Sequence, residues 1–324
     1  MTTSPIKNVN DKKINNGKDI ILPFQIEPYS LRGRFIGLSE ATTSVIKNHK
    51  YPDPVANLLA EMLVLAPCLS SALKYDGVFT LQVSGNGPVK TLLADITSDG
   101  ELRGYANFDA EQIASLNLKP NVQPSLNQLT GTGYIAFTVD QGSKGERYQG
   151  IVELSNSNLV DCTHAYFRNS EQLETVINLA VEQSAQGIWK GVAIMIQRLG
   201  FAGGQGIPQG ITEDEYDESW RNAAIMLGSC KKSELLNNER TPEKLLFQLF
   251  HEAGVRIYPN KPITAKCRCS VEKVERVLHS LENHERDDMK DNGVITITCG
   301  FCKTERIYDD NALMELDQSK YVYR

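Results

Sequence analysis

The sequence lacks an excess of positive charge and lacks a long hydrophobic run. Its 34 Lys and Arg residues stand against 40 Asp and Glu residues, which leaves a net charge of −6. Nucleic-acid binding depends on Lys and Arg side chains that neutralise phosphates, so this balance argues against a simply polyanionic partner. No apolar run reaches the roughly twenty residues that a membrane-spanning helix needs. We therefore expect neither nucleic acid nor a membrane as a partner.

We expect no targeting signal at the start of this sequence. Residues 1–18 are rich in Asn and Lys and have no long apolar segment behind them, so they are typical of neither a secretory signal nor an Arg-rich transit peptide. We expect residues 1–20 to form a disordered tail and the protein to be cytoplasmic. At 324 residues, the chain suits two or three units that each bury a core.

Cysteine is unevenly distributed. Four of the seven cysteines lie in the last fifth of the chain, at Cys267, Cys269, Cys299 and Cys302. In a reducing compartment, clustered cysteines indicate metal binding or redox activity rather than a disulfide framework. The cluster is therefore the first candidate for a functional site.

Three cysteines lie outside this cluster. Cys68 falls in an apolar run and Cys162 in a helix-like segment, and we expect both to pack in the core. Cys230 stands beside two lysines, which can lower a thiol pKa. We nevertheless interpret it as a bystander.

Residues 21–211 alternate between helix-like and strand-like segments. Turn signals rich in Gly, Asn and Asp separate β-rich runs, as in an antiparallel meander. The pattern predicts an α+β domain with a mostly antiparallel sheet and packed helices. The predicted strands are 77–84, 89–96, 101–108, 133–139, 148–154 and 191–199, and the predicted helices are 55–75 and 162–182.

Residues 212–266 follow a glycine-rich loop at 200–210, which we interpret as a hinge between domains. They open with an acidic run and then show two amphipathic helix patterns. The second pattern starts with Thr241 as N-cap and Pro242 at the first helical position. Dense charge beside dense apolar residues predicts a metastable helical linker.

Residues 267–324 contain the two close cysteine pairs, one C-x-C and one C-x-x-C, separated by twenty-nine residues. Four thiolates are the number that a tetrahedral zinc ion takes. We expect Ser270 to cap a helix that follows the first cysteine pair. A strand with alternating residues at 294–298 is expected to lead into the second cysteine pair. The spacing predicts one Zn²⁺ per chain, bound by Cys267, Cys269, Cys299 and Cys302.

Two uses of such a site remain open. A four-cysteine zinc site most often only holds its own fold. A redox switch is favoured because a C-x-C disulfide closes a very small ring and should be strained and comparatively oxidising. It is also favoured because so small a module should depend on its metal, whose binding in zinc-finger peptides is worth about 10–16 kcal/mol. Composition alone does not decide between the two uses.

From about Arg32 to Ala312 the sequence resembles the heat-shock protein 33 family, the redox-regulated bacterial holdase chaperones. The cysteine arrangement beside this N-terminal domain is specific to the family. The other matching stretches are Tyr51-Pro52-Asp53-Pro54, Leu73-Lys74-Tyr75-Asp76-Gly77, Gln82-Val83-Ser84-Gly85-Asn86-Gly87-Pro88, Leu102-Arg103-Gly104-Tyr105-Ala106, Glu234-Leu235-Leu236 and Leu249-Phe250-His251-Glu252.

The resemblance implies a chaperone that works without ATP and is not an enzyme. Reduced members hold zinc and are idle. On oxidation they form a disulfide within each close pair, lose the metal, unfold the linker and bind unfolding proteins. For this chain it implies that residues 21–211 bind substrate and dimerise, that the oxidised protein is a homodimer, and that its partners are unfolded or partially folded clients. It makes zinc ligands and redox-active disulfide residues of Cys267, Cys269, Cys299 and Cys302.

Two positions depart from the family pattern. Gly300 stands where members commonly have an acidic residue, and Arg306 stands where they commonly have an aromatic one. Neither is a ligand, but both can change the hydrogen bonding around the sulfur atoms.

Two other functions also remain open. One is a thiol oxidoreductase that uses Cys299 and Cys302, although such motifs normally follow a strand in a parallel βαβ unit. The other is a zinc-ribbon regulator that docks on protein or RNA. Residues 261–310 carry nine Lys and Arg against ten Asp and Glu, which weakens the RNA alternative.

Overall fold

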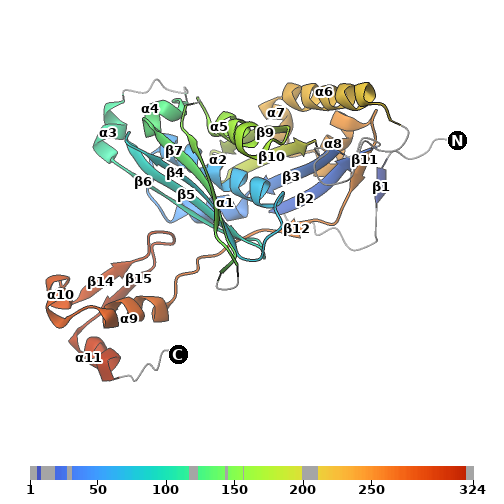
Figure 1. Cartoon of the computed structure of the whole chain (residues 1–324). Helices are drawn as coiled ribbons and strands as arrows, with labels where there is room; N and C mark the ends of the chain where they lie inside the picture. Colours follow the sequence, from blue (N-terminus) through green and yellow to red (C-terminus); the bar gives the residue numbers. More distant parts are fainter. Residues whose placement is uncertain are drawn as a thin grey trace. The chain divides into compact units, whose positions relative to one another are not determined.

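The computed structural model describes residues 6–8, 19–27, 31–116, 123–142, 145–155, 157–198 and 211–318. The chain divides into two compact units, Met1–Ala265 and Lys266–Arg324 (Figure 1). The first unit contains two hydrophobic core clusters, and the second contains one small cluster of its own. The fold is α+β with antiparallel sheets, as the sequence predicts.

One sheet of the first unit is the predicted meander. Its order is β13-β6-β5-β4-β7-β8, and all pairs are antiparallel except the short parallel contact of β13 with β6. The loop between β7 and β8 includes residues 143–144, which lie outside the described residues. The strands are β4 (Val78–Gly85), β5 (Val89–Thr97), β6 (Glu101–Phe108), β7 (Gly133–Asp140), β8 (Tyr148–Glu153) and β13 (Thr264–Ala265).

The other sheet has the order β1-β11-β2-β3-β10-β9, with β12 paired to β2. Its first strand contradicts the expected disordered tail, because β1 pairs in parallel with β11. β2 also begins at Ile20, within the expected tail, while residues 1–5 and 9–18 lie outside the described residues. The strands are β1 (Ile6–Asn8), β2 (Ile20–Ile26), β3 (Leu31–Leu38), β9 (Thr175–Gln183), β10 (Trp189–Gln197), β11 (Val255–Ile257) and β12 (Lys261–Pro262).

The helix α2 (Asp53–Ser70) is the central element of the larger core. Fourteen of its eighteen residues are buried, and it contacts strands of both sheets. Its length and composition would suit a membrane span, but 78% of that window is buried inside the protein, as in the core helix of a soluble fold. The predicted helix at 55–75 is thus confirmed, with an earlier end. The first unit also contains four shorter helices before the linker, of which α1 contacts α2: α1 (Glu40–Lys47), α3 (Ala110–Ser115), α4 (Leu126–Thr130) and α5 (Leu159–Tyr166).

The predicted helix at 162–182 is confirmed as far as Glu171 and is wrong beyond it. Helix α5 continues as a short π-helix at Phe167–Glu171 and ends at Gln172, whose φ of 54° is left-handed. The chain then forms β9, whose nine residues pair in antiparallel register with β10. The pairing of all nine residues with β10 stabilises the strand more than a local helix would be stabilised. This pairing is a tertiary contact, so the local spacing of apolar residues does not predict it.

The linker helices cover one face of the sheet that contains β2, β3 and β10. They are α6 (Glu213–Ser229), α7 (Lys232–Leu235) and α8 (Pro242–Phe250), and they share a core cluster with β2, β3 and β10. Thr241 caps α8, with Pro242 in its first turn, as predicted. The rings of Phe24 and Phe250 stack at 5.9 Å between centroids. The glycine-rich loop at 200–210 lies outside the described residues.

The second unit is small. It contains α9 (Val271–Ser280), α10 (Asn283–Asp288), α11 (Asp310–Gln318) and a hairpin of β14 (Ile295–Thr298) and β15 (Glu305–Tyr308). Ser270 caps α9 by accepting from the Lys273 N–H, as predicted. The buried core residues are Leu278, Ile295, Tyr308, Leu313 and Leu316.

A half-buried carboxyl group makes the stability of the first unit depend on pH. Burial raises the pKa of Glu61 in α2 to about 7, although a hydrogen bond from Asn57 and the charge of Lys232 oppose the shift. Because the folded pKa lies above the unfolded value of about 4.3, the proton stabilises the fold at low pH. That contribution is lost as pH rises toward and through 7.

We predict that Glu61→Gln is more stable than the wild type at pH 8, by about 2–3 kcal/mol, and that the difference shrinks toward pH 5. Urea unfolding at both pH values measures the difference. Glu111→Gln, at an exposed position of α3, is the matched control. A Glu61→Gln difference that does not change with pH would contradict the prediction.

Candidate metal centre

Two segments of the second unit bring the four clustered cysteines together. Cys267 and Cys269 lie in the extended stretch before α9, while Cys299 and Cys302 lie in the turn between β14 and β15. In an extended segment residues two apart point to the same side, so Cys267 and Cys269 can face one centre. The helix cap at Ser270 and the strand before Cys299 fix where the two segments end.

The turn that carries the second pair is closed by backbone hydrogen bonds. The Cys299 N–H donates to the Thr304 carbonyl at 2.9 Å, and the Lys303 N–H donates to the Cys299 carbonyl at 2.9 Å. Lys303 has a φ of 58°, the left-handed conformation that lets the chain reverse so tightly. The result is a knuckle with two thiols on its inner side.

The sulfur atoms have the spacing of a tetrahedral metal site. All four lie within 4.8 Å of one another. Cys267 Sγ is 3.7 Å from Cys299 Sγ, and Cys269 Sγ is 3.5 Å from Cys302 Sγ. Metal–sulfur bonds of about 2.3 Å in a tetrahedron put sulfur atoms about 3.8 Å apart. The four cysteines, each half-buried, could therefore bind a metal ion.

Nearby groups donate hydrogen bonds to the sulfur atoms. Cys267 Sγ accepts from the Cys269 N–H at 3.4 Å, and Cys302 Sγ lies 3.2 Å from the Thr304 hydroxyl. Cys269 Sγ accepts from the Arg306 guanidinium at 3.7 Å. Such donors orient the ligands and tune their charge. The spacing of the cysteines in the sequence identifies the four sulfur atoms. It does not predict that Thr304 lies beside one of them.

The thiols of the cluster differ in acidity. Burial raises the pKa of Cys267 to about 12. Burial would also raise the pKa of Cys302, but hydrogen bonds from Thr304 and from the neighbouring thiols of Cys269 and Cys267 lower it to about 6. Without a metal, Cys302 is therefore a stronger acid than Cys267.

The remaining cysteines lie in the cores of the first unit. Cys68 in α2 and Cys162 in α5 are fully buried, as predicted, and burial raises the pKa of Cys68 to about 12. Cys230, at the end of α6, is 6% exposed and belongs to the cluster under the linker helices. Burial also raises the pKa of Cys230, so these three thiols are poor nucleophiles in the folded unit.

Comparison with known proteins gives one consistent family. A family model described as Hsp33 protein matches residues 19–309. The chain is 37% identical over 294 residues to the 33 kDa chaperonin of Caulobacter vibrioides strain NA1000, covering 90% of this chain and 94% of that protein. It is 33% identical over 296 residues to the 33 kDa chaperonin of Ectopseudomonas mendocina, covering 90% and 93%.

A solved structure has the same fold. The 33 kDa chaperonin (heat shock protein 33 homolog) of Thermotoga maritima superposes with a TM-score of 0.77 and covers 94% of this chain and 99% of that chain. The two sequences are 21% identical, so this likeness concerns the fold alone.

The sulfur geometry predicts a tetrahedral thiolate site with one ion per chain. We expect Co²⁺ added to the reduced, metal-free protein to give the visible absorption of tetrahedral cobalt with sulfur ligands, which saturates at one equivalent. Cys299→Ser should weaken this binding, whereas Cys230→Ser should leave it unchanged because Cys230 lies in the other unit. An octahedral cobalt spectrum, or saturation at two equivalents, would contradict the assignment.

Proposed function

The chain belongs to the Hsp33 family, and we propose that it is a redox-regulated holdase chaperone that works without ATP in the cytoplasm. Its family supports a chaperone function. The observation that carries the regulatory part is the tetrahedral spacing of Cys267, Cys269, Cys299 and Cys302 in a unit separate from the larger fold.

In the reduced state the four cysteines would hold one Zn²⁺. Bound zinc would keep all four thiols ionised and cross-link the two segments that carry them. The unit needs such a cross-link, because its core contains five buried residues and an apolar core of that size supplies little stability. The metal would thus supply folding energy that the apolar side chains do not.

Oxidation would remove this support. In each disulfide formed with a peroxide, two thiolates lose two electrons, an S–S bond forms, and the O–O bond breaks to give two hydroxides that take up protons. A disulfide sulfur carries no negative charge, so the site would lose its metal and the unit its cross-link. All four sulfurs lie within mutual reach. We propose the pairs Cys267–Cys269 and Cys299–Cys302, because closing the shorter loop costs less chain entropy.

The linker is held on its sheet by apolar contacts. Trp220 of α6 and Leu246 and Phe250 of α8 are buried, in the same cluster as Leu22 and Ile194 of the sheet. Short amphipathic helices take most of their stability from such packing rather than from intrinsic propensity. A linker that leaves the sheet would therefore lose its helices and expose both apolar faces.

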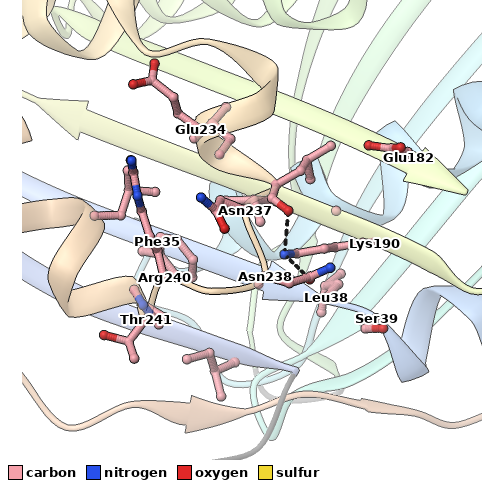
Figure 2. Close-up of a pocket in the computed structure, with 18 of the residues that line it drawn as sticks. Phe35, Leu38, Ser39, Glu182, Lys190, Glu234, Asn237, Asn238, Arg240 and Thr241 are labelled. Carbon is pink, nitrogen blue, oxygen red and sulfur yellow. Dashed lines mark hydrogen bonds between the residues drawn. The ribbon is translucent and has the colours of Figure 1, made fainter. Parts of the chain in front are cut away.

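Polar side chains of the sheet also fasten the linker. Lys190 of β10 donates to the Leu236 carbonyl at 2.8 Å and to Asn238 Oδ1 at 2.6 Å, across a hollow of about 850 Å³ that the side chains leave open (Figure 2). Asn178 of β9 donates to the Leu227 and Cys230 carbonyls at 2.9 and 2.8 Å. The interface between the linker helices and the sheet is thus incompletely filled, and its polar bonds are few. Both features are typical of a segment that can unfold locally.

The C-terminal end of the linker is attached weakly. Strands β12 and β13 pair over two residues each, with β2 and β6, and Cys267 follows β13 after one residue. Unfolding of the second unit would free the chain at that point, and fraying could spread from there into α8. The exposed apolar face of the sheet is the kind of patch that binds unfolded or partially folded proteins, and we propose a homodimer for the oxidised form.

A thiol oxidoreductase is the second candidate, because the pKa of Cys302 is lowered to about 6. A low pKa is typical of attacking thiols. However, the C-x-x-C segment leads into β15 rather than into a helix of a parallel βαβ unit. Catalytic turnover of a disulfide substrate by reduced protein would favour this candidate over the holdase.

We predict that the reduced protein contains one zinc per chain with four sulfur ligands, which X-ray absorption can measure. Peroxide should release this zinc and join Cys267 to Cys269 and Cys299 to Cys302, while Cys68, Cys162 and Cys230 stay reduced because they are buried. Peptide mapping that finds mainly disulfides between the pairs would contradict the assignment of partners. Nitrogen or oxygen ligands would contradict the zinc site.

We also predict that oxidation increases hydrogen exchange between about residues 212 and 310 and changes it little between 51 and 108. Lys190→Met should then make the reduced, zinc-bound protein partly active in suppressing client aggregation, because the α7–α8 loop loses two hydrogen bonds. Lys90→Met is the matched control: Lys90 of β5, in the other sheet, also donates to a backbone carbonyl, that of Asn86 in the β4–β5 turn, at 3.3 Å. A linker that stays protected after oxidation would contradict the switch.

A further inference from the structure

Arg198, the residue after β10, fastens the start of the linker to the sheet. Its guanidinium forms an ion pair with Asp217 of α6 through Nη2 and a second with Glu174 through Nη1, at 2.9 Å. Its Cζ also lies 4.4 Å from the centroid of the Tyr216 ring, a distance at which a cation is attracted to an aromatic face. The Arg198 side chain is 15% exposed, so solvent screens these contacts less than it screens a fully exposed ion pair.

The sheet holds Arg198 in place for this contact. Glu174 immediately precedes β9, and its carbonyl accepts a hydrogen bond from the Arg198 N–H at 3.0 Å. Arg198 and Glu174 thus belong to the sheet, while Asp217 belongs to the helix, and the guanidinium joins the two. The other end of α6 is also fastened, because Asn178 of β9 donates two hydrogen bonds to carbonyls there. Polar side chains of the sheet therefore bind α6 at both of its ends.

Helix α8 packs on the same sheet without such polar contacts. Among the described residues, no hydrogen bond or ion pair joins α8 to a strand of this sheet, and Lys190 bonds the loop before α8 rather than the helix. The two helices bury the same number of apolar side chains in the shared cluster, so the polar contacts distinguish them. These side chains are Tyr216, Trp220, Ala223 and Leu227 in α6, and Leu245, Leu246, Leu249 and Phe250 in α8.

The two helices cover different halves of the sheet. Helix α6 contacts β9, whereas α8 contacts β11, and Phe250 of α8 stacks on Phe24 of β2. The strand order β1-β11-β2-β3-β10-β9 places β9 and β11 on opposite sides of the sheet. Departure of one helix would therefore uncover one half of the apolar face and leave the other half covered.

We propose that the linker detaches in two stages and that Arg198 is the positioning residue that separates them. This inference rests on the proposed function, because it concerns the order in which the linker leaves the sheet. Helix α8 leaves first, since the chain after it leads to Cys267, and it uncovers the β2–β11 half of the apolar face. Helix α6 stays on the β9 half until Arg198 releases Asp217. The surface around Phe24 is then the first that an apolar segment of an unfolding client contacts.

The test is hydrogen exchange of the full chain, zinc-loaded at the start, in peptides from α6 and α8 at intervals after peroxide is added. In the wild type α8 should gain exchange first, with α6 about tenfold slower, because hydrogen bonds to charged groups are the stronger kind but Asp217 is 37% exposed. In Arg198→Gln the two helices should gain exchange together, and Arg198→Lys, which keeps the charge but not the planar fork, should fall between. Arg221→Gln removes an exposed cation of α6 and should leave the order unchanged.

A second variant carries the same test from the helix side. Asp217→Asn removes the partner of Arg198 on α6 and should reproduce most of the effect, and the double variant should change α6 exchange by less than the two single effects combined. Exchange of α2, in the larger core, is the internal reference for an intact fold. Wild-type helices that gain exchange at the same rate, or an unchanged order in both Arg198→Gln and Asp217→Asn, overturn the inference.

A linker that stays protected after peroxide overturns the proposed function instead. The role of Arg198 is then measured in the reduced protein, where α6 still opens locally from the sheet. Native-state exchange of α6 should be about tenfold faster in Arg198→Gln than in the wild type, with α8 changed less. Equal α6 exchange in the two reduced proteins overturns the inference.

Discussion

The second unit depends on the convergence of four sulfur atoms that the chain supplies from two distant segments. Their mutual distances stay within 4.8 Å, while the apolar core beside them contains five buried residues. Four thiolates at this spacing repel one another unless a cation lies between them. Without a metal, burial keeps at least Cys267 protonated, so under the proposed function the arrangement would contribute its full stability only when a cation binds.

The first unit is stabilised by a different interaction. Its helix α2 is buried between two sheets, and the linker helices cover a second apolar cluster on one of them. Burial of this kind does not depend on redox conditions. Polar bonds from Asn178, Lys190 and Arg198 add to the apolar contacts of the linker, and its interface leaves a hollow of about 850 Å³. The protein thus combines a large apolar core, linker helices that pack on one sheet, and a small unit that contains the four clustered cysteines.

Arg306 lies outside the ligand set but contacts one of its sulfur atoms. The sequence marks it as a departure from a family pattern, yet the departure alone does not say which atom the side chain meets. The structure supplies this, because the guanidinium donates a hydrogen bond to Cys269 Sγ from a strand of the β14–β15 hairpin.

The sequence by itself determined the features that depend on local pattern. The strands of the meander, the buried helix α2, the caps at Thr241 and Ser270, and the meeting of the four clustered cysteines follow from alternation, helical spacing, capping chemistry and cysteine spacing. Each of these signals lies within a few residues of the element that it specifies, or in a spacing known to hold a metal.

Only the tertiary structure decided what depends on partners far away in the sequence. The segment Thr175–Gln183 has helical spacing but becomes a strand because β10 offers a full antiparallel edge. Ile6–Asn8 forms a strand, in a segment expected to be disordered, because β11 lies beside it. Thr304 and Arg306 lie within hydrogen-bond distance of Cys302 Sγ and Cys269 Sγ because the β14–β15 hairpin brings them to the cysteines. In each case the deciding free energy comes from a contact between segments, and no local window of sequence contains it.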